Sequence, residues 1–355
     1  MKKVIFISAL AIAAAVSCTK SDIVDTKFGN DVIGFENYIG RDAQTKASVA
    51  TTIGSGAGIY GYYTGSKQYV ATATDANPAS KTNLWVNGTL AQGGTVDPVK
   101  YWTNTEDWYT FAAYAPKDNS NLVVPTTEFT GDPVITYNVP TALSSQIDLL
   151  YANAKDQHKP AEGGKVSLPF NHALSRLTVT AEAVKGDFTF TVTNVTVEGG
   201  FYTSGKLNLM TGLWSDQVEA KHADDEATAD VNEKNDVYTI LNTPATLSSE
   251  KVDFAGTAKD NYLMFIPTDK AVTLNVTYTI TYAGETSKPN NKSFAITPAG
   301  GFVKGFAYAV NLNFMLDEDN AITFDVTVNK WDESTPDQVV YPEGKPTATD
   351  EPAEE

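Results

Sequence analysis

The sequence predicts an all-β protein made of antiparallel β-sandwiches, and three observations support this fold class. Tyr, Phe, Gly and Thr are plentiful, and aromatic and β-branched side chains suit the pleated surface of a sheet. Apolar residues alternate with polar ones along many short runs, so one face of each run meets a core and the other meets water. The segments between the runs are rich in Gly, Pro, Asn and Asp, the residues that turns require.

The composition limits the classes of function. The chain has 355 residues, which is long enough for two domains with separate cores. It carries 26 Lys and Arg against 43 Asp and Glu, a formal net charge of -17 that repels nucleic acid and anionic lipid. A single Cys excludes an intrachain disulfide and a zinc site built from cysteines. No nucleic-acid partner is expected.

The first segment is expected to be an export signal. Residues 1–3 contain two lysines, and residues 4–16 are apolar but too short to span a bilayer as a permanent helix. The segment ends in Ser17 and Cys18, which resembles the lipobox of bacterial lipoproteins. This likeness implies cleavage of residues 1–17 and lipidation of Cys18. The alternative is an ordinary signal peptide followed by an incidental cysteine.

Strand-like runs follow in order along the rest of the chain. Residues 19–46 are mostly polar and contain one strand-like run, in which Ile33, Phe35 and Ile39 follow the period of two that a strand requires. From about residue 47 the strand signals multiply, and a change of phase near Asn194 predicts a β-bulge or turn there. The clearest alternating runs are 177–183, 188–193, 274–282, 308–314 and 322–328.

The order of these runs predicts two sandwich domains, because a break in the pattern falls at residues 184–187. Residues 219–235 are almost all polar and are expected to form a solvated loop or a short helix. The final segment holds four prolines and ends in acidic residues, so we expect it to be disordered. The predicted divisions are a signal peptide at 1–17, a pro-segment at 18–46, sandwiches at 47–185 and 186–334, and a tail at 335–355.

Motifs for catalysis are present only in part. Residues 56–61 match the pattern G-x-G-x-x-G, but the residues that follow are β-prone, so we expect a glycine-rich strand rather than a dinucleotide site. His172 and Ser175 are close in sequence, but neither a nucleophile elbow nor an orienting acid accompanies them. We therefore expect His172 to be a structural residue at a strand end.

The acidic and aromatic clusters give no specific site. Residues 317–320 form an Asp-Glu-Asp-Asn cluster, but Ile322 and Val328 occupy the positions where a calcium loop of the EF type needs Gly and Glu. The aromatic residues at 101–102 and 108–109 would suit a sugar platform, yet aromatic residues among strands are more often part of a core. No catalytic residue, metal site or cofactor is predicted.

Five motifs, taken together and in order after a lipobox, resemble a known family. They are KYW at 100–102, DWYTFAAYAP at 107–116, DLLYA at 148–152, FNHALSRLTV at 170–179 and ITFDVTVNKW at 322–331. The chain resembles the fimbrillins, which are FimA/Mfa-like type V pilins of Bacteroides-like bacteria. The resemblance spans nearly the whole chain after the signal.

The resemblance implies both a fold and a mechanism. Fimbrillins have two transthyretin-like antiparallel β-sandwich domains in tandem. They are exported as lipoproteins to the outer membrane and then lose an N-terminal segment to a trypsin-like, often Arg-specific, protease. The loss of a strand opens a groove, and donor-strand exchange with the next subunit builds a fimbria that supports adhesion.

This mechanism assigns roles to particular residues. Arg41 is the first candidate for cleavage. Lys46 is the second: it stands where many relatives carry Arg, and an Arg-specific protease would not recognise Lys there. The alternative is that both residues are ordinary surface charges. The removable strand would hold Ile33, Phe35 and Ile39. The candidate donor strand, which could equally be an integral strand of the second domain, holds Ile322, Phe324, Val326 and Val328.

The expected partners are other pilin subunits, a trypsin-like maturation protease and the outer membrane, reached through the lipid on Cys18. The surface ligand is not identified by the sequence, and stalk, tip and anchor roles all remain open. The alternative function is a surface lipoprotein that binds a glycan or a protein ligand without polymerising. An enzyme is the least supported class.

Overall fold

The computed structural model describes part of the chain, and the statements below concern that part. For residues 322–330 and 338–340 it describes the backbone. The described residues are 31–39, 53, 56–69, 82–127, 131–161, 164–184, 187–220, 237–241, 243–254, 262–315, 322–330 and 338–340.

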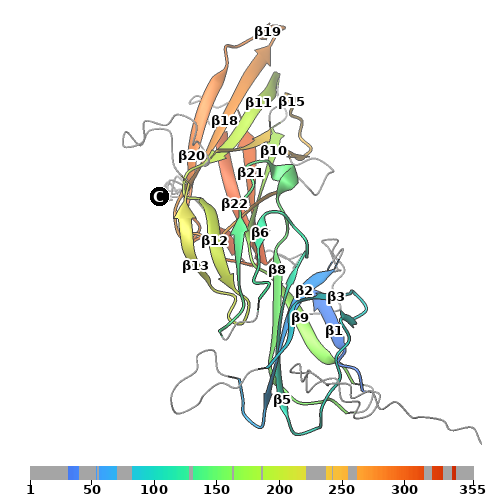
Figure 1. The fold of residues 1–355 in the computed structure, drawn as a ribbon. Coiled ribbons are helices and arrows are strands. Elements are labelled where there is room, and N and C mark those ends of the chain that lie inside the picture. The colour runs from blue at the N-terminus through green and yellow to red at the C-terminus, as the bar shows by residue number, and fades with distance from the viewer. Residues whose placement is uncertain are drawn as a thin grey trace, which may run out of the picture.

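The first sheet is seven-stranded and lies at one end of the molecule (Figure 1). Its strand order is β1-β9-β8-β5-β2-β3-β4, and its neighbours are antiparallel except for β1 and β9, which are parallel. The strands are β1 (Phe35–Ile39), β2 (Ala57–Gly65), β3 (Thr82–Leu90), β4 (Val96–Asp97), β5 (Trp108–Ala115), β8 (Leu150–Gln157) and β9 (Val166–His172).

A four-stranded sheet of order β13-β12-β7-β6 covers part of the first sheet. One face of β2 and β5 contributes Tyr60 and Tyr114 to a shared core with Tyr137 and Leu207 of this smaller sheet. The opposite face of β5 contributes Phe111 to a second core. The central strands are therefore buried on both faces. The strands of the smaller sheet are β6 (Leu122–Val123), β7 (Val134–Asn138), β12 (Tyr202–Asn208) and β13 (Trp214–Glu219).

Two six-stranded sheets pack face to face at the other end (Figure 1). One has the order β16-β10-β21-β22-β23 with β17 beside β10, and the other has the order β14-β11-β18-β19 with β15 beside β11 and β20 beside β18. The strands of the first are β10 (Ser175–Ala183), β16 (Val252–Asp253), β17 (Leu263–Phe265), β21 (Phe306–Phe314), β22 (Ile322–Lys330) and β23 (Gln338–Val340). Those of the second are β11 (Phe188–Glu198), β14 (Val237–Leu241), β15 (Ala245–Thr246), β18 (Val272–Tyr282), β19 (Glu285–Thr286) and β20 (Asn290–Ile296).

The all-β prediction is confirmed, and the predicted bulge near Asn194 is present as a register shift between β11 and β18. Not every pair is antiparallel, because β10 and β21 also run parallel. Moreover, β10 precedes the expected break at 184–187 but lies in the sheet of the later strands. Helical structure in the described residues is limited to one 3-10 turn, Leu143–Ser145, and none of their helices is long and apolar enough to cross a membrane.

Candidate functional site

The segment that contains β1 is bonded on both of its sides. On one side, β1 pairs with β9 from Phe35 opposite Val166 to Ile39 opposite Phe170. On the other side, the Phe35 N–H donates to the Gly94 carbonyl at 2.9 Å. Farther along, the Ile33 N–H donates to the carbonyl of Lys100, also at 2.9 Å. The segment thus closes the gap between the β9 edge and the chain that enters and leaves β4.

Two apolar side chains anchor this segment in the core. Ile33 is 0% exposed and Phe35 is 1% exposed. The Phe35 ring meets Phe111 edge-on, with 4.9 Å between ring centroids, and lies 6.2 Å from the Trp85 ring. Ile39 is half-buried at the margin of the same core. Truncation of a buried Phe to Ala typically costs about 3–5 kcal/mol, so Phe35 dominates the side-chain contribution of β1.

A glycine permits this close approach. Gly94 has a φ of +84°, and a Cβ atom placed on it would lie 1.7 Å from the carbonyl oxygen of Phe35. No other residue fits there without moving one of the two backbones. The identity of residue 94 therefore helps to define the groove in which β1 lies.

Polar side-chain contacts at the surface of the segment contribute less than its apolar anchors. Asp31 forms an ion pair with Lys159, and the Asn37 amide donates to the Ala91 carbonyl at 3.1 Å. The Asp31 and Lys159 side chains are 38% and 22% exposed, and ion pairs of this kind contribute only about 0–1 kcal/mol. The apolar anchors and the backbone bonds, rather than the ion pair, hold β1.

This arrangement has a simple chemical consequence. Removal of residues 31–39 would leave the β9 edge with unpaired N–H and C=O groups and would expose the apolar surface around Phe111 and Trp85. Such an edge binds another strand readily. The groove is thus a candidate site for an added β-strand.

The residues predicted to be modified or cleaved lie outside the described part of the chain. This holds for Cys18, Arg41 and Lys46. Their roles stay predictions, as does the division into a signal peptide and a pro-segment.

The candidate donor strand is β22, which lies between β21 and β23 of its own chain. Ile322, Phe324, Val326 and Val328 pair in register with Phe314, Leu312, Val310 and Tyr308. This pairing is what the alternative of an integral strand requires, and the identity of the donor stays a prediction.

His172 has an acidic partner that the sequence did not reveal. Its Nδ1 lies 2.8 Å from Oδ1 of Asp148, and its ring is almost fully buried. The Ser175 hydroxyl is 0% exposed and donates to the Val303 carbonyl at 2.9 Å. The Asp–His pair is therefore separate from a buried, engaged Ser175, and the structure supports a structural role for His172.

The other motifs are also parts of the framework. Residues 57–61 of the glycine pattern belong to β2. Trp102 and Tyr109, from the possible sugar platform, are 3% and 0% exposed and lie in the core. Among the described residues, no group of three or more His, Cys, Asp or Glu is placed to hold a metal ion.

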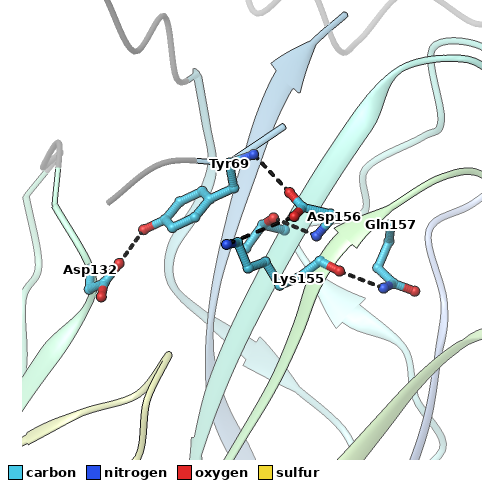
Figure 2. Close-up of polar contacts among 6 residues, drawn as sticks. Tyr69, Asp132, Lys155, Asp156 and Gln157 are labelled. Atoms are coloured by element: carbon cyan, nitrogen blue, oxygen red, sulfur yellow. Dashed lines mark hydrogen bonds and ion pairs between the residues drawn. The ribbon is translucent and has the colours of Figure 1, made fainter. Parts of the chain in front are cut away.

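A polar network beside β8, which the sequence did not indicate, fixes the chain after β2 (Figure 2). The Tyr69 hydroxyl donates to Oδ1 of Asp132 at 2.7 Å, and the Tyr69 N–H donates to Oδ1 of Asp156 at 2.7 Å. Burial raises the pKa of Tyr69 far above its ordinary value, so its hydroxyl stays protonated and keeps donating in alkaline solution as well. The two hydrogen bonds join residues that are 63 and 87 positions apart in the sequence.

Comparisons with known proteins give a consistent result. A family model described as fimbrillin-like matches residues 45–331. No curated protein matches the chain. Among solved structures, a fimbrial protein from Bacteroides vulgatus is 20% identical with a TM-score of 0.59, and the match covers 85% of this chain and 100% of that one.

Two further solved structures match a similar share of the chain but have lower TM-scores. A candidate cell adhesion protein from Bacteroides ovatus is 17% identical with a TM-score of 0.45, over 85% of this chain and 98% of that one. Another from Bacteroides uniformis is 18% identical with a TM-score of 0.43, over 84% and 98%. The likeness to the Bacteroides vulgatus protein shows a shared fold.

Proposed function

The chain belongs to the fimbrillin-like family, and from this premise we propose that it is a structural subunit of a cell-surface fimbria. The observation that carries the proposal is the groove of β1, where one short strand supplies both backbone pairing and an aromatic anchor. A pilin or adhesin-like protein of the cell surface is the function class that the family and the fold support.

The proposed maturation begins with export and lipidation at Cys18, which would tether the chain to the outer membrane. A trypsin-like protease then cleaves after Arg41 or Lys46. Arg41 is two residues beyond the end of β1, so cleavage there separates β1 from the rest of the chain. After cleavage β1 still has to leave its groove, and its hydrogen bonds on both sides set the activation barrier for that departure.

The empty groove would then accept a donor strand from another subunit. A new strand that pairs with β9 and inserts an apolar side chain beside Phe111 would restore the backbone hydrogen bonds of the β9 edge and cover the exposed apolar surface at once, as in donor-strand complementation. Dissociation is slow in this arrangement, because it exposes the same apolar surface again.

The sequence of β22 is compatible with this role. Ile322 and Phe324 repeat the spacing of Ile33 and Phe35. In the same alignment, Val326 takes the place of Asn37, and Val328 that of Ile39. A strand with the sequence of β22, added parallel to β9, would therefore place Phe324 at the position of the Phe35 anchor.

The test treats soluble protein 19–355 briefly with trypsin and follows intact mass and SDS-resistant laddering. We expect loss of the segment up to Arg41 or Lys46, followed by ladders. The control is the double variant Arg41→Ala and Lys46→Ala, which should remain a folded monomer. Polymers formed by that variant would contradict proteolytic release, and absence of any discrete trimming would favour a surface lipoprotein that keeps β1 and does not polymerise.

A further inference from the structure

A second candidate site lies away from the β1 groove. It is bordered by the β12–β13 hairpin and by two loops, one just before β18 and one just after β20. It is an open hollow of about 380 Å³. That volume falls within the range of small-molecule sites. Its walls include Tyr202, Trp214, Gln217, Asp269, Phe302 and Lys304.

The indole of Trp214 is a rigid wall of this hollow. Its Nε1–H donates to the Ala173 carbonyl at 2.8 Å. The ring lies over Gly205, where an added Cβ would come within 3.1 Å of it. The hydrogen bond and the flat contact together fix the ring before any ligand arrives, and a preorganised aromatic side chain loses little entropy on binding.

The loop opposite Trp214 is held just as firmly. Phe302 and Thr268 exchange two backbone hydrogen bonds, at 2.7 and 3.1 Å. The Tyr308 hydroxyl donates to the Gly301 carbonyl at 3.1 Å. Lys304 then donates from this loop to the Gly212 carbonyl of the β12–β13 hairpin. The two sides of the hollow are thus tied together, and its shape is largely preformed.

Polar groups at the rim are free to bind. Within the described part of the chain, the side chains of Gln217 and Asp269 have no hydrogen-bond partner. The charges nearby are largely engaged, because Lys270 pairs with Glu219 and lies over the Tyr202 ring, 5.6 Å from its centroid. The hollow therefore offers aromatic surface, an amide and a carboxylate, with little excess charge of either sign.

We propose that this hollow binds a neutral hexose unit of a glycan. A sugar ring has an apolar C–H face and a rim of hydroxyl groups. The fixed indole of Trp214 can pack against the face, while the Gln217 amide can donate and accept hydrogen bonds at the rim and the Asp269 carboxylate can accept them. This proposal goes beyond subunit assembly and needs neither cleavage nor polymerisation.

The test measures, by isothermal titration calorimetry, the binding of neutral hexasaccharides (hexaoses) of glucose, mannose and galactose to the uncleaved, exported protein. We expect at least one hexaose to bind, and expect Gln217→Ala and Asp269→Ala each to weaken it by up to about tenfold, the loss of one hydrogen bond. Trp214→Ala should abolish it. Because this last variant loses a core contact, the two rim variants provide the decisive result.

A second tryptophan, in the first sheet, provides an aromatic control. Trp108 begins β5 of the first sheet, is half-buried and contacts the His158 ring, with 3.6 Å between centroids, and neither residue lines the hollow. Trp108→Phe should leave hexaose binding unchanged. Absence of binding by every hexaose, or binding that both rim variants leave intact, would overturn the proposal without affecting the pilin assignment.

Discussion

At the scale of single residues, the contact between Gly94 and Phe35 decides how β1 is held. The Phe35 N–H reaches the Gly94 carbonyl at 2.9 Å, and the left-handed φ of Gly94 keeps the turn clear of the strand. Neighbouring Gly93 has nothing within 4 Å of its Cβ position. Two adjacent glycines thus have quite different structural roles.

The first prediction follows from this contrast. Gly94→Ala should displace β1 and lower the free energy of unfolding by about 1–3 kcal/mol, because Ala is strained at positive φ and collides with the Phe35 carbonyl. Gly93→Ala is the matched control and should change little. Urea unfolding and the rate of trypsin cleavage at Arg41 measure the effect, and equal behaviour of the two variants would refute the role given to Gly94.

Buried tyrosines make stability sensitive to alkaline pH. Burial raises the pKa of Tyr114 to about 12, and raises those of Tyr60 and Tyr62 still further. These hydroxyls stay protonated in the folded state while the unfolded chain ionises near its ordinary pKa of about 10. Their contribution is therefore complete below that value and is lost as the pH rises through the folded pKa.

The second prediction is a loss of structure at high pH. The part of the tyrosinate absorbance at 295 nm that comes from the buried tyrosines should appear together with the loss of the far-UV circular dichroism signal, above a pH of about 10. Tyr60→Phe should shift this transition to higher pH. Tyr282→Phe, at a ring that is 53% exposed, is the control and should not shift it. Ionisation of the buried tyrosines without unfolding would contradict this account.

At the scale of elements, β1 is a strand whose side-chain contribution is concentrated at one end. Phe35, at the start of β1, and Ile33, just before it, are buried, while Glu36 is exposed and the residues after it are half-buried. The strand also gains backbone bonds from both neighbours. A free peptide with the same residues should therefore bind to the groove after trimming.

The third prediction concerns such a peptide. A labelled peptide of residues 31–41 should bind to trypsin-trimmed monomer, and Phe35→Ala should weaken it about a hundredfold or more, since loss of a buried Phe costs about 3–5 kcal/mol. The same peptide with Glu36→Ala is the control and should bind as well as the original. Fluorescence anisotropy gives the affinities, and equal affinity of all three would show that the groove does not recognise the anchor.

β22 is the second element whose role can be decided by experiment. It pairs with β21 along its whole length, from Ile322 opposite Phe314 to Lys330 opposite Phe306. β23 covers only part of its other edge, from Val326 to Val328. Loss of β22 would leave the β21 edge unpaired, whereas loss of β23 alone would affect three residue pairs.

The fourth prediction compares two truncations. A chain that ends at residue 321 should lose a large part of the roughly 5–15 kcal/mol typical of a folded protein, and a peptide of residues 322–340 should restore it. A chain that ends at residue 335 keeps β22 and serves as the control. Chemical unfolding measures both, and unchanged stability of the shorter chain would show that β22 is not an integral strand.

At the scale of the whole molecule, strands from the two halves of the sequence are interleaved. The four-stranded sheet takes β6 and β7 from the first half and β12 and β13 from the second. β10 precedes the expected domain break yet pairs along its length with β21. A cut at 185/186 would separate β10 from β21 and β7 from β12.

The fifth prediction is that the fragments 47–185 and 186–334 do not fold when expressed singly. Each would lack a strand that its sheet needs, and the exposed edges would aggregate. Dispersed amide signals in the NMR spectrum of each fragment would contradict this and would support the boundaries expected from sequence. The control is the intact chain 47–334 with a protease site inserted at 185/186, which should remain associated after the cut.

Part of the candidate site was readable from the sequence. The period of two of Ile33, Phe35 and Ile39 predicts a strand in this segment; the structure places β1 from Phe35 to Ile39, and Ile33 is buried just before it. Gly94 and the carbonyl of Lys100 were not readable as their partners, because they lie about 60 positions away and the contacts involve backbone atoms. Asp148 was missed beside His172 because it lies 24 positions away in the sequence, and only the fold brings the two side chains together.

The sequence by itself determined the all-β class, most of the alternating strands and the family resemblance, because side-chain periodicity and turn residues are local properties. It did not determine which strands are neighbours. The parallel pairing of β1 with β9 and of β10 with β21, and the burial of β5 on both faces, were decided by tertiary structure alone. Strand pairing depends on hydrogen bonds and packing between distant segments, and neither leaves a periodic signal in the segments that form them.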